Sequence, residues 1–284
     1  MRGGYKTRRR LANAAVYVIL AVLAVVWLLP IAYLLLQSFR AEAGAYTPYL
    51  LPKAYTVDNY TALFTDTGLF PYPRWLGNTL LVAVCSCVLS TALILMLSYC
   101  FSRLRFSSRR SFMNAGLILG MFPGFMAMIA VYHLLKLVGL DGSLAALVLV
   151  YSAGACLGYF IAKGFFDTLP RALDEAATID GATRNDIFWR ITLPMSGPIV
   201  VYTALTSFIA PFADFIFVSV IMKDNYENYT VALGLFQMIS RENVYAYFTR
   251  FCAGAAVVAV PITLLFLALQ RYYVEGVTGG AVKG

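Results

Sequence analysis

Residues 175–198 read EAATIDGATRNDIFWRITLPMSGP, a polar segment between two apolar stretches of a very hydrophobic chain. Pro170 suits the first turn of a helix, and Gly181 predicts the end of that helix, at a turn that needs a positive φ. Thr183 then suits a helix N-cap, and Asp186, three residues later, completes an acidic variant of the capping box. The segment therefore predicts two short helices at an angle.

Prolines mark the end of this segment, and each of its predicted helices has a distinct face. Phe188 and Ile191 share one side of the second helix. Pro194 cannot continue that helix, and Pro198 opens the next apolar stretch. The first helix carries small residues that would let another backbone approach closely, namely Ala172, Ala176 and Ala177. A polar helix–turn–helix is expected between two apolar spans.

The composition predicts a membrane protein. The chain is 61% hydrophobic and 13% charged, whereas soluble domains average about 25% charged residues. About 20 apolar residues cross a bilayer core as a helix. Six such spans are predicted, at about 12–37, 76–101, 112–137, 143–163, 198–222 and 251–271. The expected fold is all-α, a polytopic membrane protein with one membrane domain over 1–284, with kinks at Pro123-Gly124 and Pro261.

The positive charges predict the orientation in the membrane. Most of the 22 Lys and Arg residues lie in 2–10, 103–110, 163–190 and 271–283. The positive-inside rule places these segments, and with them both termini, in the cytoplasm. Arginines beside anionic lipid head groups account for the net charge of +8. They lie scattered between apolar spans and form no continuous basic face, so no binding of nucleic acid is predicted.

Two segments outside the predicted helices have competing interpretations. Ala41-Glu42-Ala43 resembles a signal-peptidase site, but the apolar stretch before it exceeds the roughly 7–15 residues of a signal peptide, so a retained first helix is expected. The outer loop 223–250 mixes aromatic and charged residues. It is either an interfacial aromatic belt or a docking surface for another protein.

The sequence predicts neither a catalytic site nor a metal site. His133 is the only histidine, and the cysteines fall within predicted helices without C-x-x-C spacing. The chain has no G-x-x-x-x-G-K-[ST] loop for ATP phosphates and no G-x-S-x-G elbow. It is therefore expected not to be an enzyme and to bind no cofactor itself.

Few ionisable residues fall inside the predicted spans. His133 and Lys136 lie near the outer end of the third span, where a lysine can reach water, so a structural role is expected. Asp214 lies deep in the fifth span, where a charge is costly and usually functional or internally paired. It is predicted either to line a translocation path or to bond to a neighbouring helix for assembly.

The polar segment resembles the "EAA" coupling loop of permease subunits of bacterial ATP-binding-cassette importers. The matching positions are Glu175, Ala176, Ala177, Asp180, Gly181, Ala182, Ile191, Leu193, Pro194 and Pro198. Residues 270–284, QRYYVEGVTGGAVKG, are similar to the tail of the maltose/maltodextrin-type second permease. Residues 211–214 and 229–234 are also similar to that carbohydrate branch, although Pro211-Phe212-Ala213 stands where many members have a Trp-Asn-Asp-like run.

This resemblance implies a subunit that moves a maltodextrin-like oligosaccharide across the bacterial cytoplasmic membrane. It implies a homologous second permease, two cytoplasmic ATPase subunits that hold ATP and Mg, and an extracytoplasmic sugar-binding protein. The coupling loop, about 168–194, would contact the ATPases through Glu175, Ala176, Ala177, Asp180, Gly181, Ala182, Leu193 and Pro194. The C-terminal tail, about 272–284, would reach them through Gly279, Gly280, Lys283 and Gly284.

Three alternatives remain at this stage. An importer of another small solute would share the coupling loop, but residues 271–284 favour the carbohydrate branch. A carrier driven by an ion gradient usually has several membrane carboxylates or an inverted repeat, whereas this chain offers Asp214 alone. A membrane scaffold without transport function leaves the polar helix–turn–helix unexplained.

Overall fold

The computed structural model describes residues 3–121 and 124–279, and their regular elements are all helical apart from one isolated bridge between Arg40 and Tyr55. The prediction of an all-α, polytopic fold is confirmed. The internal contacts divide the chain into two units. Unit 1 comprises residues up to Phe70 together with Gln237–Val257, and unit 2 comprises Pro71–Phe236 together with the residues from Val258 onward. The expectation of a single membrane domain stays a prediction.

Unit 1 contains α1 (Gly3–Ser38), α2 (Asp58–Thr65) and the first part of α14 (Val244–Gly279). Arg40 organises the loop after α1, because its side chain is fully buried and satisfied by neutral acceptors. Its guanidinium donates to Gln37 Oε1 at 2.6 Å and to the carbonyls of Glu42 and Gly44. A buried arginine held in this way fixes the path of the backbone around it.

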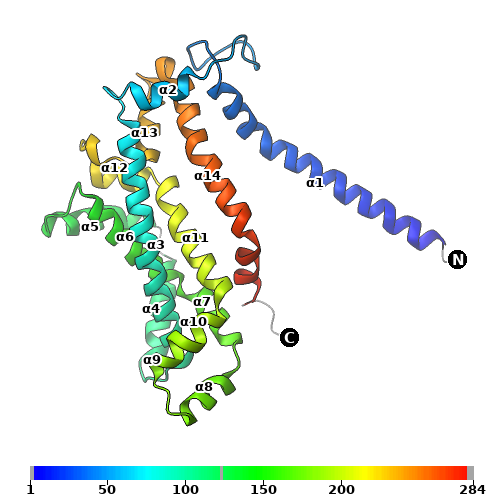
Figure 1. Ribbon diagram of the computed structural model, residues 1–284, viewed down its shortest axis with the longest axis vertical. Helices are drawn as coiled ribbons and strands as arrows, with labels where there is room; N and C mark the ends of the chain where they lie inside the picture. Colours follow the sequence, from blue (N-terminus) through cyan, green and yellow to red (C-terminus); the bar gives the residue numbers. More distant parts are fainter. Residues whose placement is uncertain (1–2, 122–123, 280–284) are drawn as a thin grey trace. The chain divides into compact units, whose positions relative to one another are not determined.

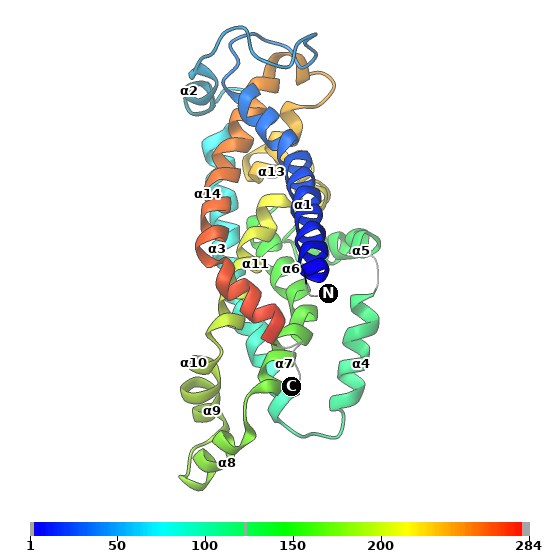
Figure 2. The same cartoon turned by 90° about the vertical axis from the view of Figure 1, so that its right-hand side faces the viewer.

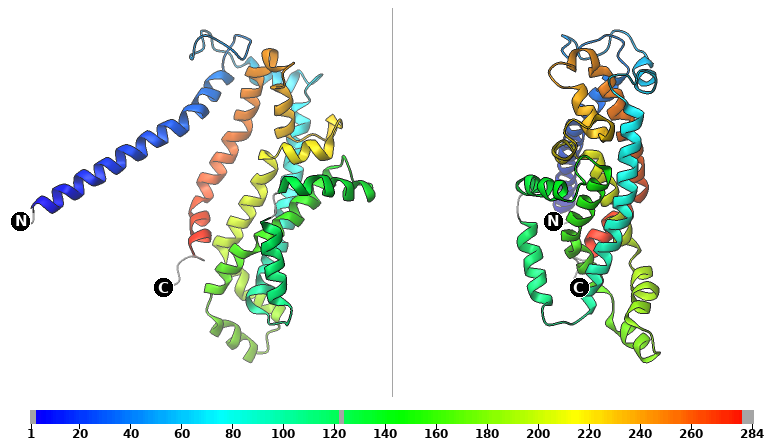
Figure 3. Two further views of the ribbon diagram at one scale, coloured as in Figure 1. Left: turned by 180° about the vertical axis from the view of Figure 1, so that it is seen from behind. Right: turned by 90° about the vertical axis from the view of Figure 1, so that its left-hand side faces the viewer.

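Unit 2 is built around the long helix α3 (Tyr72–Arg103), which runs along the unit beside the other helices (Figures 1 and 3). It packs chiefly against α11 (Gly197–Ala213), α6 (Leu144–Ala155) and α7 (Tyr159–Thr168). Its buried face carries small residues at helical spacing, namely Ala83, Ser86 and Ser90. Small side chains let neighbouring membrane helices approach closely.

The remaining elements of unit 2 are short. They are α4 (Arg109–Gly120), α5 (Gly124–Leu137), η1 (Cys156–Gly158), α8 (Arg171–Ile179), α9 (Arg184–Ile187), η2 (Phe188–Thr192), α10 (Leu193–Met195), α12 (Ile216–Met222), η3 (Tyr226–Asn228) and most of α13 (Val231–Met238). Figure 2 shows α8, α9 and α10 together at one end of the unit. The segment 223–250, predicted as an outer loop, is largely helical.

Three described helices are long and apolar enough to cross a membrane, with candidate spans at Arg8–Ser38, Tyr72–Arg103 and Val244–Val274. Two bent helix pairs raise the number to five at most. One is α6 with α7, bent by 45°, and the other joins Arg184–Met195 to α11 at 84°. The sequence predicted six spans, one more than this maximum.

The predicted span 112–137, expected to be interrupted at Pro123-Gly124, consists of two helices, α4 and α5, which run in different directions (Figure 2). The kink predicted there falls partly on Pro123, which lies outside the described residues. The predicted span 198–222 is also two helices, α11 and α12, separated at Asp214 and Phe215. By contrast, α14 continues through Pro261 to Gly279, past the predicted end of the sixth span.

Candidate functional site

The polar segment begins with α8, whose N-cap is Pro170. After this helix Gly181 adopts a φ of +86°, as predicted, and its amide bonds to the carbonyl of Thr178 at 3.1 Å. The amide of Ala182 bonds to the carbonyl of Ala177 at 2.9 Å. A Cβ added at Gly181 would meet nothing within 4 Å. The glycine is therefore required by the backbone conformation and not by lack of space.

The predicted capping box of α9 is confirmed. The amide of Asp186 donates to Thr183 Oγ1 at 3.2 Å, and the amide of Thr183 donates to Asp186 Oδ2 at 3.1 Å. Hydrogen bonds from the hydroxyl and the amide of Thr183 lower the pKa of Asp186. The charged carboxylate is thus part of the cap at neutral pH.

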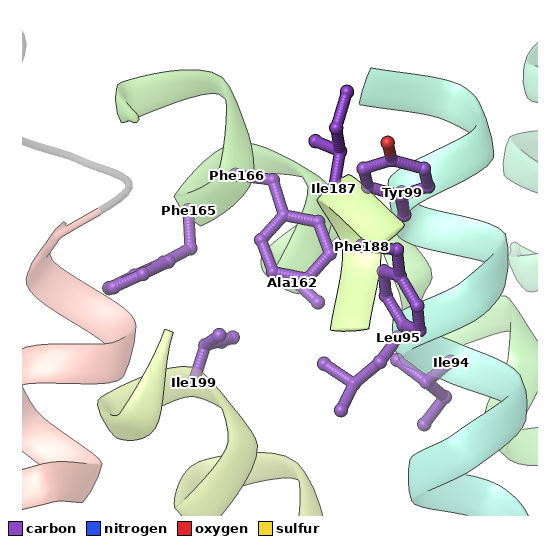
Figure 4. Close-up of a cluster of buried hydrophobic side chains, with 9 residues drawn as sticks. All are labelled: Ile94, Leu95, Tyr99, Ala162, Phe165, Phe166, Ile187, Phe188 and Ile199. Carbon is purple, nitrogen blue, oxygen red and sulfur yellow. The ribbon is translucent and has the colours of Figure 1, made fainter. Parts of the chain in front are cut away.

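A cluster of buried apolar side chains joins the segment to the membrane helices (Figure 4). Ile187 and Phe188 come from the segment. The ring centroids of Phe188 and Tyr99 are 5.0 Å apart. We call this set the coupling core, made of Ile94, Leu95, Tyr99, Ala162, Phe165, Phe166, Ile187, Phe188 and Ile199. Ile191, predicted to share a face with Phe188, packs against it.

Polar contacts add a second connection between the segment and α3. The Arg103 Nε lies 3.2 Å from Asp174 Oδ2, and the two side chains are only 3% and 12% exposed. Arg103 Nη2 also donates to the carbonyl of Leu169 at 2.9 Å, and the Tyr99 hydroxyl donates to the carbonyl of Arg184 at 3.1 Å. The last turn of α3 is thereby bonded to both short helices. Sequence analysis missed Arg103 and Asp174, because each resembles an ordinary surface charge.

The predicted coupling residues divide by exposure. Ala177, Ala182 and Leu193 pack against the coupling core. The others face outward and contribute nothing to the interior of this chain, namely Glu175, Ala176, Asp180, Gly181 and Pro194. Beside them Ile179 is 86% exposed and Trp189 is 50% exposed. Large apolar side chains held outward on a well-packed base suit contact with another protein.

The sequence placed Asp214 deep in the fifth span. In the structure it lies at the break between α11 and α12. Its backbone is extended, with φ −91° and ψ 108°. Its Oδ1 accepts the amide of Phe217 at 3.0 Å, and its Oδ2 accepts the hydroxyl of Tyr151 at 3.0 Å. The carboxylate therefore starts α12 and ties it to α6.

Asp214 and Tyr151 also line a cavity of about 1070 Å³ within unit 2. Most of the lining is apolar, and the polar side chains are Ser90, Tyr151, Tyr202, Thr203, Thr206, Ser207 and Asp214. Ser90 is 1% exposed, and its hydroxyl has no hydrogen-bond partner among the described residues. The cavity thus combines an apolar wall with a few polar side chains, as small-molecule sites do.

The predicted tail site falls only partly within the described residues. Residues 272–279 continue α14 as a helix and are not an extended tail. Gly279 is the last residue of that helix. Gly280, Lys283 and Gly284 lie outside the described residues.

Comparisons with known proteins cover nearly the whole chain. The family described as "binding-protein-dependent transport system inner membrane component" matches residues 4–279. The galactooligosaccharides transport system permease protein GanQ of Bacillus subtilis is 33% identical over 285 residues, covering 100% of both chains. The maltodextrin transport system permease protein MdxG of Bacillus subtilis is 34% identical, and the match covers 98% of this chain and 99% of MdxG. The maltodextrin transport system permease protein MalD of Streptococcus pneumoniae is also 34% identical, and the match covers 100% of both chains.

Solved structures share the fold. A chain of a bacterial ABC transporter involved in the import of the acidic polysaccharide alginate superposes with a TM-score of 0.78 at 20% identity, covering 93% of this chain and 97% of that one. A chain of the MetNI methionine ABC transporter gives a TM-score of 0.57 at 16% identity, covering 72% of this chain and 95% of that one.

Proposed function

Because this chain belongs to the family of binding-protein-dependent transport system inner membrane components, we propose that it is the permease subunit of an ATP-driven oligosaccharide importer. The main support for this proposal is the full-length similarity to permeases of galactooligosaccharide and maltodextrin transport systems. These relatives also confirm the resemblance predicted from the coupling loop and the C-terminal residues. An importer of a different solute is the second candidate, since a methionine transporter shares the fold.

The proposed subunit lies in the bacterial cytoplasmic membrane with both termini in the cytoplasm. Apolar spans such as Tyr72–Arg103 support the membrane location, and the distribution of Lys and Arg supports the orientation. Its partners would be a homologous second permease, two ATPase subunits that bind ATP and Mg, and an extracytoplasmic sugar-binding protein. The alginate transporter, whose fold this chain shares, has been crystallised with a pentasaccharide-bound periplasmic protein.

We propose that α8 and α9 transmit movement of the ATPases to the membrane helices. Glu175, Ile179 and Trp189 point outward and would make the contact. The coupling core and the Arg103–Asp174 pair would then carry the displacement to α3 and α7. Close-packed side chains resist deformation, so α8 and α9 would move with the ends of these helices.

The cavity beside Asp214 is the proposed sugar path in this subunit. The hydroxyl groups of a sugar form hydrogen bonds with carboxylates, hydroxyls and amides. The apolar faces of its rings pack on aromatic side chains. Asp214 supplies a carboxylate, and Tyr202 supplies an aromatic ring. These features support Asp214 as a path residue more than as an assembly residue.

One reconstitution experiment tests the function. The complex captured by a tag on this chain is placed in liposomes, and uptake of labelled maltodextrin, galactooligosaccharide and methionine is measured with and without ATP inside. We expect ATP-dependent uptake of an oligosaccharide. Uptake of methionine alone would overturn the sugar assignment, and uptake driven by an ion gradient without ATP would overturn the importer class.

Two charge reversals test the coupling role in the same liposomes. Glu175→Lys should abolish most substrate-stimulated ATP hydrolysis, because truncating one partner of an interface charge pair costs about 2–5 kcal/mol. Asp58→Lys reverses a charge at an exposed aspartate of α2, outside the segment, and should leave stimulation unchanged. Equal stimulation in both variants would contradict the assignment of α8 as the contact helix.

A further inference from the structure

A second pocket lies in the connection between α3 and α4, and the proposed transport cycle makes no use of it. It has a volume of about 390 Å³ and we call it the arginine pocket, lined by Arg105, Phe106, Ser107, Arg109, Arg110 and Met113. All six residues lie in the described part of the chain. Three of the six lining residues are therefore arginines.

The arginine pocket carries a positive charge that its own surroundings do not neutralise. No aspartate or glutamate is among its lining residues. Within the described residues, Arg105, Arg109 and Arg110 take part in none of the ion pairs, which involve other basic residues. Arg109 Nε is shielded from solvent and has no hydrogen-bond partner there. A buried donor of this kind is costly unless something outside the chain accepts its hydrogen bond.

Arg103 ends the preceding helix and does not belong to this free charge. Asp174 and the carbonyl of Leu169 already occupy its guanidinium group. The charge available in the arginine pocket is thus confined to the segment 105–110.

The start of α4 adds to the attraction for an anion. This helix begins at Arg109 after Ser108, whose side chain makes no capping hydrogen bond, and it has no acidic residue in its first turn. The first amides of a helix lack partners within it, and its dipole favours a negative group there. The helix end and the guanidinium groups therefore attract the same kind of ligand.

The position of the arginine pocket favours a lipid as the source of that anion. The candidate membrane span of α3 ends at Arg103, directly before the pocket. α4 then exposes large apolar side chains, including Phe112 and Ile118. In Figure 2 the α3–α4 connection lies at the same end of unit 2 as α8 and α9. Charged groups where an apolar helix ends meet the head groups of the bilayer.

We propose that the arginine pocket binds the phosphate group of an anionic phospholipid. The guanidinium groups of Arg105, Arg109 and Arg110 would bond its oxygens, since planar guanidinium groups match phosphate geometry. Phe106 and Met113 provide apolar surface beside them for the first part of the acyl chains. The same chemistry would also accept free phosphate, so the test must separate the two sources.

The test uses the full chain in phosphatidylcholine nanodiscs. Thermal unfolding is followed while phosphatidylglycerol replaces part of the phosphatidylcholine, and separately while inorganic phosphate is added. A ligand that binds only the folded state raises the melting temperature with its concentration. We expect phosphatidylglycerol to raise it in a saturable way. A rise with inorganic phosphate in neutral nanodiscs would also support the pocket but identify free phosphate as its ligand.

Matched variants localise the effect. Replacing Arg105, Arg109 and Arg110 by Gln should weaken binding at least about tenfold, because hydrogen bonds to charged groups are among the strong ones. Replacing Arg8, Arg9 and Arg10 by Gln removes the same charge from exposed positions on α1, outside the pocket, and should weaken binding far less than the pocket variant does. The milder variant Arg110→Gln, at an exposed position, should weaken binding without loss of folding.

Three outcomes would overturn the proposal. The first is the absence of any saturable effect of either probe. The second is equal weakening in both triple variants, which indicates diffuse attraction by net charge. The third is unchanged binding in both the pocket triple variant and Arg110→Gln. Because none of these readouts involves transport or ATP, their failure is distinct from failure of the proposed function.

Discussion

The ion pair between Arg103 and Asp174 should be essential for holding α8 to α3. Asp174→Asn keeps the size of the side chain but removes the charge that faces Arg103 Nε at 3.2 Å. Since the arginine side chain is 3% exposed, water cannot replace the lost partner. Nη1 of Arg103 is already buried without a hydrogen-bond partner among the described residues.

The expected cost follows from the geometry. At an effective dielectric constant of about 20, two unit charges this far apart attract by about 5 kcal/mol. Desolvation of both groups offsets much of this, but removing one partner leaves a buried charge and costs about 3–5 kcal/mol. In a domain of this size that corresponds to a fall in melting temperature on the order of 10 °C.

Thermal unfolding of the purified chain measures this cost. Asp180→Asn makes the same chemical change at an exposed position in the same segment and should shift the melting temperature little. The double variant Arg103→Met with Asp174→Leu should recover most of the stability, because a packed apolar pair often replaces a buried ion pair without loss. If Asp174→Asn melts like the unmodified chain, the pair does not hold α8 to α3.

Four further predictions concern single features of the chain. Gly181→Ala should lower substrate-stimulated ATP hydrolysis, since a φ of +86° costs a residue with a Cβ about 1–2 kcal/mol; Gly181→Asn should be milder, and equal effects would refute the backbone explanation. The lowered pKa of Asp186 means that its capping contribution is present at neutral pH and lost as the pH falls below the ordinary value of 3.8; Asp186→Asn should flatten this acid dependence of thermal unfolding, and an unchanged profile would argue against it. Asp214→Asn should change uptake kinetics across several sugars while the second permease still copurifies; loss of copurification would instead assign Asp214 to assembly. Deletion of residues 277–284 should leave membrane insertion intact and weaken copurification of the ATPases, whereas unchanged copurification and activity would remove the proposed tail contact.

The start of α9 and the turn before it in the polar segment could be predicted, because their signals are local. A capping box such as Thr183–Asp186 and a positive φ at Gly181 depend on residues within a few positions of each other. Pro194 does not end the second helix, as the sequence predicted, because the helical stretch that begins at Arg184 continues through Pro194 to Met195. The same locality explains why the apolar face of Phe188 and Ile191 was identified correctly.

The breaks in the membrane helices were harder to predict. Between α11 and α12 the chain leaves the helix at Asp214, and its carboxylate accepts a hydrogen bond from the amide of Phe217, near the start of α12. Hydropathy is high on both sides of this break, so an average over the stretch 198–222 cannot detect it. The partners of Asp214 and Arg103 come from distant positions, Tyr151 and Asp174, and no sequence spacing connects them.

The coupling core and the cavity have residues in common, which gives the proposed mechanism a direct physical connection between α9 and the cavity. Ile94 on α3 and Ala162 on α7 belong to the coupling core and also line the cavity. On α3, Ser90 faces the cavity and Tyr99 contacts Phe188, so about 13 Å of helix separates the two ends. A helix packed along this length moves as a rigid rod. A displacement of α9 must therefore either shift the cavity wall at Ser90 and Ile94 or open a void in the coupling core, which close packing disfavours.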